Sequence, residues 1–181
     1  MAAIKLLGLD PGLRFTGWGV LAVDGNRLRH IADGVVAVAA SGTLADRLAR
    51  LYRGLEVVVA THMPDEVAVE ETFVNRNPVS TLKLGQARGV VMLVPALASL
   101  PVYEYSANLI KKSLVGTGHA TKDQVTMMIR TLLPGARLEK ADAADALAVA
   151  VCHAHHRTAP SRRLDPVALP EAVKVAAKVT G

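Results

Sequence analysis

The chain has 181 residues, of which 51% are hydrophobic and 20% are charged, a composition typical of a folded domain and unlike that of a disordered chain. The net charge of +5 and a pI near 9.6 favour a polyanionic partner. No apolar run reaches the length of a membrane span, no secretory signal is recognisable, and the single cysteine, Cys152, excludes an intramolecular disulfide. We therefore expect a cytoplasmic protein.

Three antiparallel strands are predicted first. An apolar run over residues 4–9 ends at the turn signal Asp10-Pro11-Gly12. A second strand is expected over 15–23 and a third within 28–38, because Asp24-Gly25-Asn26 between them is typical of a hairpin turn.

Helices and strands then alternate. The segment Ser41-Gly42-Thr43 introduces an amphipathic helix whose apolar stripe is Leu44, Leu48, Leu51 and Leu55. A fourth strand is predicted over 66–70, followed by a polar loop over 73–77. Asn77-Pro78 is a helix start, and the helix runs toward residue 97. Its small-residue stretch Gly85-Gln86-Ala87-Arg88-Gly89 favours a close helix contact or a dimer seam.

A fifth strand is predicted over 102–105, followed by a helix that carries Lys111 and Lys112. Thr121 and Gln124 form a capping-box pair that starts the next helix, and the last helix is expected over 141–156. This order predicts an α/β fold with a five-stranded mixed sheet flanked by helices. Residues 1–157 are expected to form the domain, and 158–181 a basic, Pro-containing, flexible tail.

Four carboxylates stand where apolar segments meet a turn or a helix start: Asp10, Glu70, Asp142 and Asp145. Each has an ordinary structural explanation, such as a turn residue or a favourable charge at a helix N-terminus. Functional groups, however, gather at the carboxyl ends of parallel strands, and the spacing of Asp142 and Asp145 puts both on one helix face.

Four converging carboxylates would repel one another, by roughly 4 kcal/mol for two unit charges at about 4 Å and an effective dielectric near 20. A bound Mg²⁺ removes this repulsion because it prefers hard carboxylate oxygens. Two such ions about 4 Å apart activate a water and stabilise the leaving oxygen in an in-line displacement. The acids therefore predict a metal-dependent enzyme.

Five motifs in order resemble those of RuvC, the bacterial Holliday-junction endonuclease family. They are Leu9-Asp10-Pro11-Gly12, Thr16-Gly17-Trp18-Gly19, Val69-Glu70, Leu84-Gly85-Gln86-Ala87-Arg88-Gly89 and Ala141-Asp142-Ala143-Ala144-Asp145-Ala146-Leu147-Ala148. The resemblance covers about residues 4–156. It implies a ribonuclease-H-like fold and a homodimer that nicks two strands of like polarity at a four-way DNA junction, leaving 5′-phosphate ends. It also implies a branch-migration complex of the RuvA and RuvB proteins as a partner.

By position, the resemblance makes Asp10, Glu70, Asp142 and Asp145 the catalytic metal ligands, with two Mg²⁺ ions expected and Mn²⁺ as a possible substitute. Neighbouring strand residues face opposite sides, and the family motif selects Glu70 over Glu71. Lys111 and Lys122 match basic residues near the scissile phosphate and the junction backbone, and both are expected to be catalytic and to bind DNA. Phe73 matches an aromatic residue that stacks on unpaired bases.

Further DNA contacts are expected from Lys112, Arg76 and Arg88. Lys111 and Lys112 are equally well explained as a solvated helix face, and a loop phenylalanine such as Phe73 often packs into the core. The three histidines His153, His155 and His156 close a helix, where polar or positive groups are common, and we assign them no site role.

Other function classes remain open from the residues alone. One is a ribonuclease-H-fold nuclease of unbranched nucleic acid, and another is a catalytically silent junction-binding protein, which would not need all four acids. An actin-like sugar kinase or ATPase also has a first strand that ends in an acid followed by glycine. Such proteins need a duplicated domain, so the length of this chain disfavours them.

Overall fold

The computed structural model describes residues 3–71 and 77–157. Its five strands are β1 (Ile4–Asp10), β2 (Phe15–Asp24), β3 (Arg27–Ala37), β4 (Glu66–Glu71) and β5 (Val102–Ser106). They form one sheet in the order β3-β2-β1-β4-β5. The β1–β2 and β2–β3 pairs are antiparallel, whereas β1–β4 and β4–β5 are parallel. The predicted mixed sheet is confirmed.

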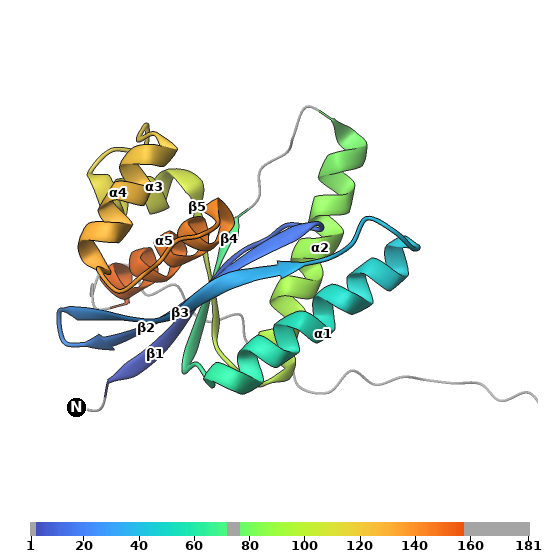
Figure 1. The fold of residues 1–181 in the computed structure, drawn as a ribbon, viewed down its shortest axis with the longest axis horizontal. Coiled ribbons are helices and arrows are strands. Elements are labelled where there is room, and N and C mark those ends of the chain that lie inside the picture. The colour runs from blue at the N-terminus through green and yellow to red at the C-terminus, as the bar shows by residue number, and fades with distance from the viewer. Residues whose placement is uncertain (1–2, 72–76, 158–181) are drawn as a thin grey trace, which may run out of the picture.

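Helices cover both faces of the sheet (Figure 1). They are α1 (Leu44–His62), α2 (Pro78–Leu97), α3 (Ala107–Val115), α4 (Lys122–Leu132) and α5 (Ala141–His156). One face carries α3, α4 and α5, and the other carries α1 and α2. Within residues 3–71 and 77–157, none of the helices combines the length and the apolar character that a membrane span requires.

The local signals act as predicted at the turns and helix starts. Thr121 and Gln124 form the reciprocal capping box of α4, and Asn77 accepts hydrogen bonds from the first turn of α2. Thr43 forms a second capping box with Asp46 at α1. Gly25 has a φ of 56°, the left-handed conformation that a tight hairpin between β2 and β3 requires.

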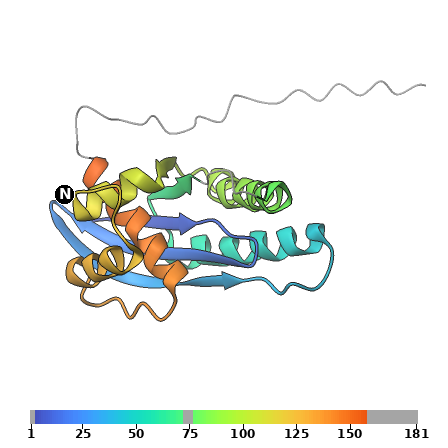
Figure 2. The same ribbon diagram turned by 90° about the horizontal axis from the view of Figure 1, so that it is seen from above.

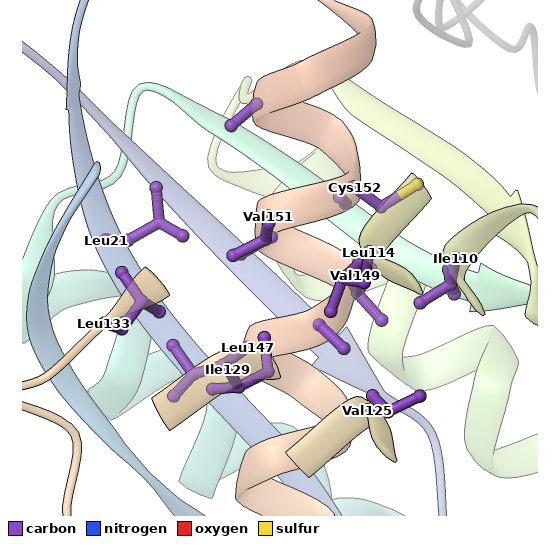
Figure 3. Packing of buried hydrophobic residues seen from close by; sticks show 14 of the residues in the cluster. Leu21, Ile110, Leu114, Val125, Ile129, Leu133, Leu147, Val149, Val151 and Cys152 are labelled. Atoms are coloured by element: carbon purple, nitrogen blue, oxygen red, sulfur yellow. The ribbon is translucent and has the colours of Figure 1, made fainter. Parts of the chain in front are cut away.

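The alternation of side chains along the central strands divides the interior into two hydrophobic cores. On β1, Leu6 faces α5, whereas Leu7 and Leu9 face α1 and α2. The α5 core gathers side chains from α3, α4, α5 and β2, with Leu147 of α5 at its centre (Figure 3). Asp10 lies four residues after Leu6 on the same strand, so its side chain points to the same face of the sheet, toward α5.

The helix α5 packs closely across β1 and β2 (Figure 2). A Cβ at Gly8 would lie 2.7 Å from the backbone nitrogen of Ala150 and closer still to the carbonyl oxygen of Ala146. A Cβ at Gly17 would collide with the backbone of Asp142 in the same way. These strand glycines therefore set how close α5 comes to the sheet, and with it the position of the acids at the start of α5.

The substitution Gly8→Ala is expected to destabilise the fold, because neither the strand nor the helix backbone can move away without disrupting the core. We expect a loss of about 3 kcal/mol or more in the free energy of unfolding, measured by urea denaturation. Gly118→Ala is the matched control, since a Cβ there has its shortest contact at an ordinary 3.4 Å. Equal stability of the two variants would contradict the close approach of α5.

Candidate active site

Two of the four predicted acids lie at neighbouring strand ends. Asp10 ends β1, and Glu70 lies next to the end of β4, the parallel neighbour of β1 in which Val69 is the register partner of Leu9. Parallel strands bring their carboxyl ends to the same edge of the sheet, so the two side chains meet there. The other two acids, Asp142 and Asp145, come to this edge on the first turns of α5.

The strand β4 presents Glu70 and its neighbour Glu71 to opposite faces of the sheet. Ala68 belongs to the core under α5 and Val69 to the core under α1 and α2. By the same alternation Glu70 faces α5 and Glu71 faces away. Glu70 lines a cavity at this edge of the sheet, and Glu71 does not. The geometry agrees with the choice of Glu70 as the site residue.

The turn after Asp10 is held by a side chain that the sequence reasoning missed. Thr16 is fully buried, donates a hydrogen bond of 2.6 Å from its hydroxyl to the carbonyl oxygen of Gly12, and accepts one of 3.3 Å from the Gly12 amide. A buried hydroxyl with both partners satisfied fixes the backbone around it. In the motif Thr16-Gly17-Trp18-Gly19, Thr16 secures the turn and Gly17 allows the close approach of α5, but the motif alone does not mark Thr16 as buried.

A cavity of about 240 Å³ lies where these elements meet. Its polar lining comes from Asp10, Glu70, Lys111, Lys122 and Asp145. The structure thus places three of the four predicted acids and both predicted catalytic lysines in one cavity. Asp142 is not part of the lining, but its charge acts on Asp10.

Mutual repulsion and burial perturb the acids strongly. Burial, followed by the charges of Glu70, Asp145 and Asp142, raises the pKa of Asp10 from 3.8 to about 8. Burial and the charge of Asp145 also raise the pKa of Glu70, against the opposing effect of Lys122 and Lys111. Perturbed carboxylates that share a cavity are typical of catalytic and metal-binding sites.

The lysine Lys122 partly offsets this negative charge. Its ammonium donates a hydrogen bond of 3.0 Å to Asp145, and this contact raises the pKa of Lys122. The lysine side chain is 77% exposed, so the pair is a weak, solvent-screened interaction that another partner can displace. Lys122 is the first residue of α4, where a cation opposes the helix dipole, so its position serves the site and not the helix.

The chemistry of this donor set fits a divalent cation. Among the described residues, no three histidine, cysteine, aspartate or glutamate side chains form a complete metal-binding group. Burial and the charges of the neighbouring carboxylates disfavour the ionised form of Asp10, and a bound cation would offset both effects. Hard carboxylate oxygens with room for water and phosphate are the environment that Mg²⁺ prefers.

The start of α5 departs from ordinary helix design. Its N-cap residue is Lys140, and no side chain caps the first turn. A lysine is a poor N-cap because it brings positive charge to the positive end of the helix dipole. Local rules are most often broken at functional sites, where a different requirement takes precedence.

The remaining predicted DNA-contact residues lie elsewhere. Lys112 is exposed on α3 and does not line the cavity. Arg88 of α2 forms an ion pair with Glu104 of β5, which faces the opposite side of the sheet from α5. Phe73 and Arg76 lie outside the described residues.

The histidines at the end of α5 are far along the helix from the acids. His153 is buried, shares a hydrogen bond of 2.7 Å with the Tyr105 hydroxyl, and contacts Glu66 at 2.8 Å. Arg157 also binds Glu66, and these contacts lower the pKa of Glu66 to about 2, with the His153 hydrogen bond as the largest cause. The group anchors the end of α5 to β4 and β5 and takes no part in the acid cavity.

Comparison with known proteins identifies the family. Residues 6–153 match the family described as crossover junction endodeoxyribonuclease RuvC. This chain belongs to the RuvC family. It is 65% identical over 154 residues to RuvC of Paramagnetospirillum magneticum, which covers 85% of this chain and 93% of that protein. It is 67% identical over 154 residues to RuvC of Rhodospirillum rubrum, with 85% and 91% covered.

A solved RuvC structure shares the fold. Thermus thermophilus RuvC in complex with a Holliday junction substrate superimposes with a TM-score of 0.79 at 34% identity, over 85% of this chain and 94% of that one. The fold is therefore ribonuclease-H-like, as the resemblance implied. Membership of the RuvC nuclease family also implies a divalent metal requirement.

The raised pKa of Asp10 predicts a pH-dependent stability in the presence of a chelator. Asp10 stays protonated in the folded protein above its unfolded pKa of 3.8, so it stabilises the fold at low pH and loses this effect as the pH rises toward 8. The loss is at most about 1.4 kcal/mol per pH unit. Asp10→Asn removes this pH-dependent loss of stability. The difference in thermal midpoint, variant minus wild type, should therefore increase between pH 5 and 8.5. Parallel midpoints across this range would contradict the raised pKa of Asp10.

Proposed function

We propose that this protein is a Mg²⁺-dependent endonuclease that hydrolyses phosphodiester bonds in Holliday junctions. The observation that carries the proposal is the gathering of Asp10, Glu70 and Asp145 around one cavity, with Asp142 beside it, in a chain of the RuvC family. Its relatives are named crossover junction endodeoxyribonucleases, and T. thermophilus RuvC was solved with a Holliday junction substrate.

The four acids Asp10, Glu70, Asp142 and Asp145 would hold the metal, with two Mg²⁺ ions expected and Mn²⁺ as a substitute. When bound, the ions supply charge neutralisation at the scissile phosphate and lower the pKa of a coordinated water. The acids themselves fix where the phosphate sits. The half-buried position of Asp10 and Glu70 limits the access of bulk water to the reacting centre.

The two lysines of the cavity would bind and polarise the phosphate. A lysine ammonium is a compact charge that contacts phosphate oxygens and offsets negative charge as it develops. Lys111 faces the acids from α3. Lys122 is paired with Asp145 through an exposed and weak contact, so its ammonium could exchange that carboxylate for a phosphate oxygen.

Further DNA contacts are proposed from the family motif. Phe73, in the segment after β4, would stack on unpaired bases at the crossover, and Arg76 would contact the backbone nearby. Lys112 is exposed on α3 next to Lys111 and would add a phosphate contact at the rim. Arg88 would have to exchange Glu104 for a phosphate, since that carboxylate is its partner in the structure.

A homodimer would supply the second active site that two symmetric nicks require. The outer face of α2 carries the exposed apolar residues Leu82, Leu93 and Leu97, which are 47–65% exposed. A Cβ at Gly85 or Gly89 would meet open space, so this face is free for close contact with another helix. An exposed apolar stripe of this kind favours a self-complementary interface. The RuvA and RuvB proteins remain the proposed branch-migration partners.

The proposal predicts that Asp10→Asn abolishes junction cleavage and leaves junction binding nearly intact. The rate in Mg²⁺ should fall by more than about 100-fold, because even the outer-shell partners of a metal ligand account for 10- to 100-fold. Single-turnover cleavage of a labelled four-way junction measures the rate, and binding in EDTA measures affinity.

Glu71→Gln is the matched control. It also removes one carboxylate charge, but from the face of β4 that points away from the cavity. It should cleave like wild type. Retained cleavage by Asp10→Asn would disprove the assignment of this site, and so would equal losses in the two variants.

A further inference from the structure

The phenylalanine Phe15 is an exposed aromatic residue near the start of α5. It begins β2 directly after the turn that carries Asp10, and its side chain is 40% exposed. Phe15 and Gly17 lie on the same face of the strand, and Gly17 is in contact range of the Asp142 backbone. The ring therefore lies on the α5 side of the sheet, near the first turn of α5 that carries Asp142.

Two cations flank the ring of Phe15. The guanidinium carbon of Arg14 lies 5.2 Å from the ring centroid, and the ammonium of Lys140 lies 5.9 Å from it. Arg14 comes from the turn before β2, where its carbonyl oxygen accepts a hydrogen bond of 2.9 Å from the amide of Val38. Lys140 comes from the N-cap of α5. Two anchored segments thus bring both cations to one aromatic side chain.

Stability of the fold does not account for this arrangement. Among the described residues, Phe15 contributes to neither hydrophobic core, whereas Leu13 and Trp18 on either side of it do. Lys140 occupies a position where a lysine weakens the helix. Exposed cation–π contacts are also weak and readily exchanged for stronger partners.

Nucleic acid is the ligand that matches these three side chains. An aromatic face stacks on any base, and flanking cations bind the phosphates on either side of it. The negative charge of the acids next to them confines phosphate contacts to Arg14 and Lys140 until a cation neutralises the cavity. An acidic peptide would use the cations but would leave the exposed ring unexplained.

We propose that Arg14, Phe15 and Lys140 form a nucleotide-binding subsite next to the scissile phosphate. An unpaired base of the cleaved strand stacks on Phe15, and its flanking phosphates bind Arg14 and Lys140. This inference rests on the proposed nuclease function and adds a DNA contact where the start of β2 meets the start of α5. The subsite holds the strand in place and takes no part in bond cleavage.

Binding of the full chain to a four-way junction and to a linear duplex in EDTA tests the subsite. Phe15→Leu keeps an apolar side chain but removes the stacking face, and Phe15→Tyr keeps that face. We expect Phe15→Leu to bind the junction about 5- to 20-fold more weakly, with Phe15→Tyr close to wild type and duplex binding little changed. Lys140→Ala should reduce the slope of log affinity against log salt by about one.

Arg27→Ala, which removes an exposed cation at the far end of the β2–β3 hairpin, is the charge control and should bind like wild type. Thermal midpoints establish that each variant is folded. Junction binding by Phe15→Leu equal to wild type would overturn the subsite, and so would equal losses in Phe15→Leu and Phe15→Tyr. Wild-type cleavage in Mg²⁺ is measured separately, so a wild type that does not cut junctions refutes the nuclease function while the binding data still decide the subsite.

Discussion

Repulsion among carboxylates is the constraint on which the site depends. The fold holds Asp10, Glu70 and Asp145 around one cavity with Asp142 beside it, and burial together with the charges of the other three acids raises the pKa of Asp10 to about 8. Close packing of α5 on Gly17 at Asp142, and on Gly8 at Ala146 and Ala150, resists that repulsion. The contacts of His153 with Tyr105 and Glu66 secure the other end. A cation that relieves the repulsion therefore binds a scaffold that is already in place.

The acid cavity and the surfaces outside it have different roles, because they can contact different parts of the DNA. A cavity of about 240 Å³ lined by acids and two lysines has room for a phosphate and its cations, and every strand of DNA presents the same phosphate. Selectivity for a junction must then arise outside the cavity. The outer face of α2 can set the distance between two sites in a dimer, and the ring of Phe15 can distinguish an unpaired base from a stacked one.

Much of this architecture could be predicted from local sequence signals. Turn residues, capping boxes and apolar runs act over a few residues, so the strands and the start of α4 at Thr121 were predictable. The acids were found because each stands where an apolar segment meets a turn or a helix start. The role of Thr16 was not, because a threonine in a strand has no local mark of a buried hydroxyl bound to Gly12. The proposed subsite at Phe15 was also not predicted, because Lys140 comes to the ring from a segment 125 positions later in the chain.

The most direct test is incubation of the wild-type protein with a synthetic four-way junction and with a linear duplex of the same arm sequence, each with and without Mg²⁺. We expect paired nicks at symmetric positions in two strands of the junction, only when Mg²⁺ is present, with the duplex left intact. The paired positions require two active sites, and the metal requirement follows from the four acids. Cleavage without a divalent cation, or equal cleavage of junction and duplex, would contradict this account.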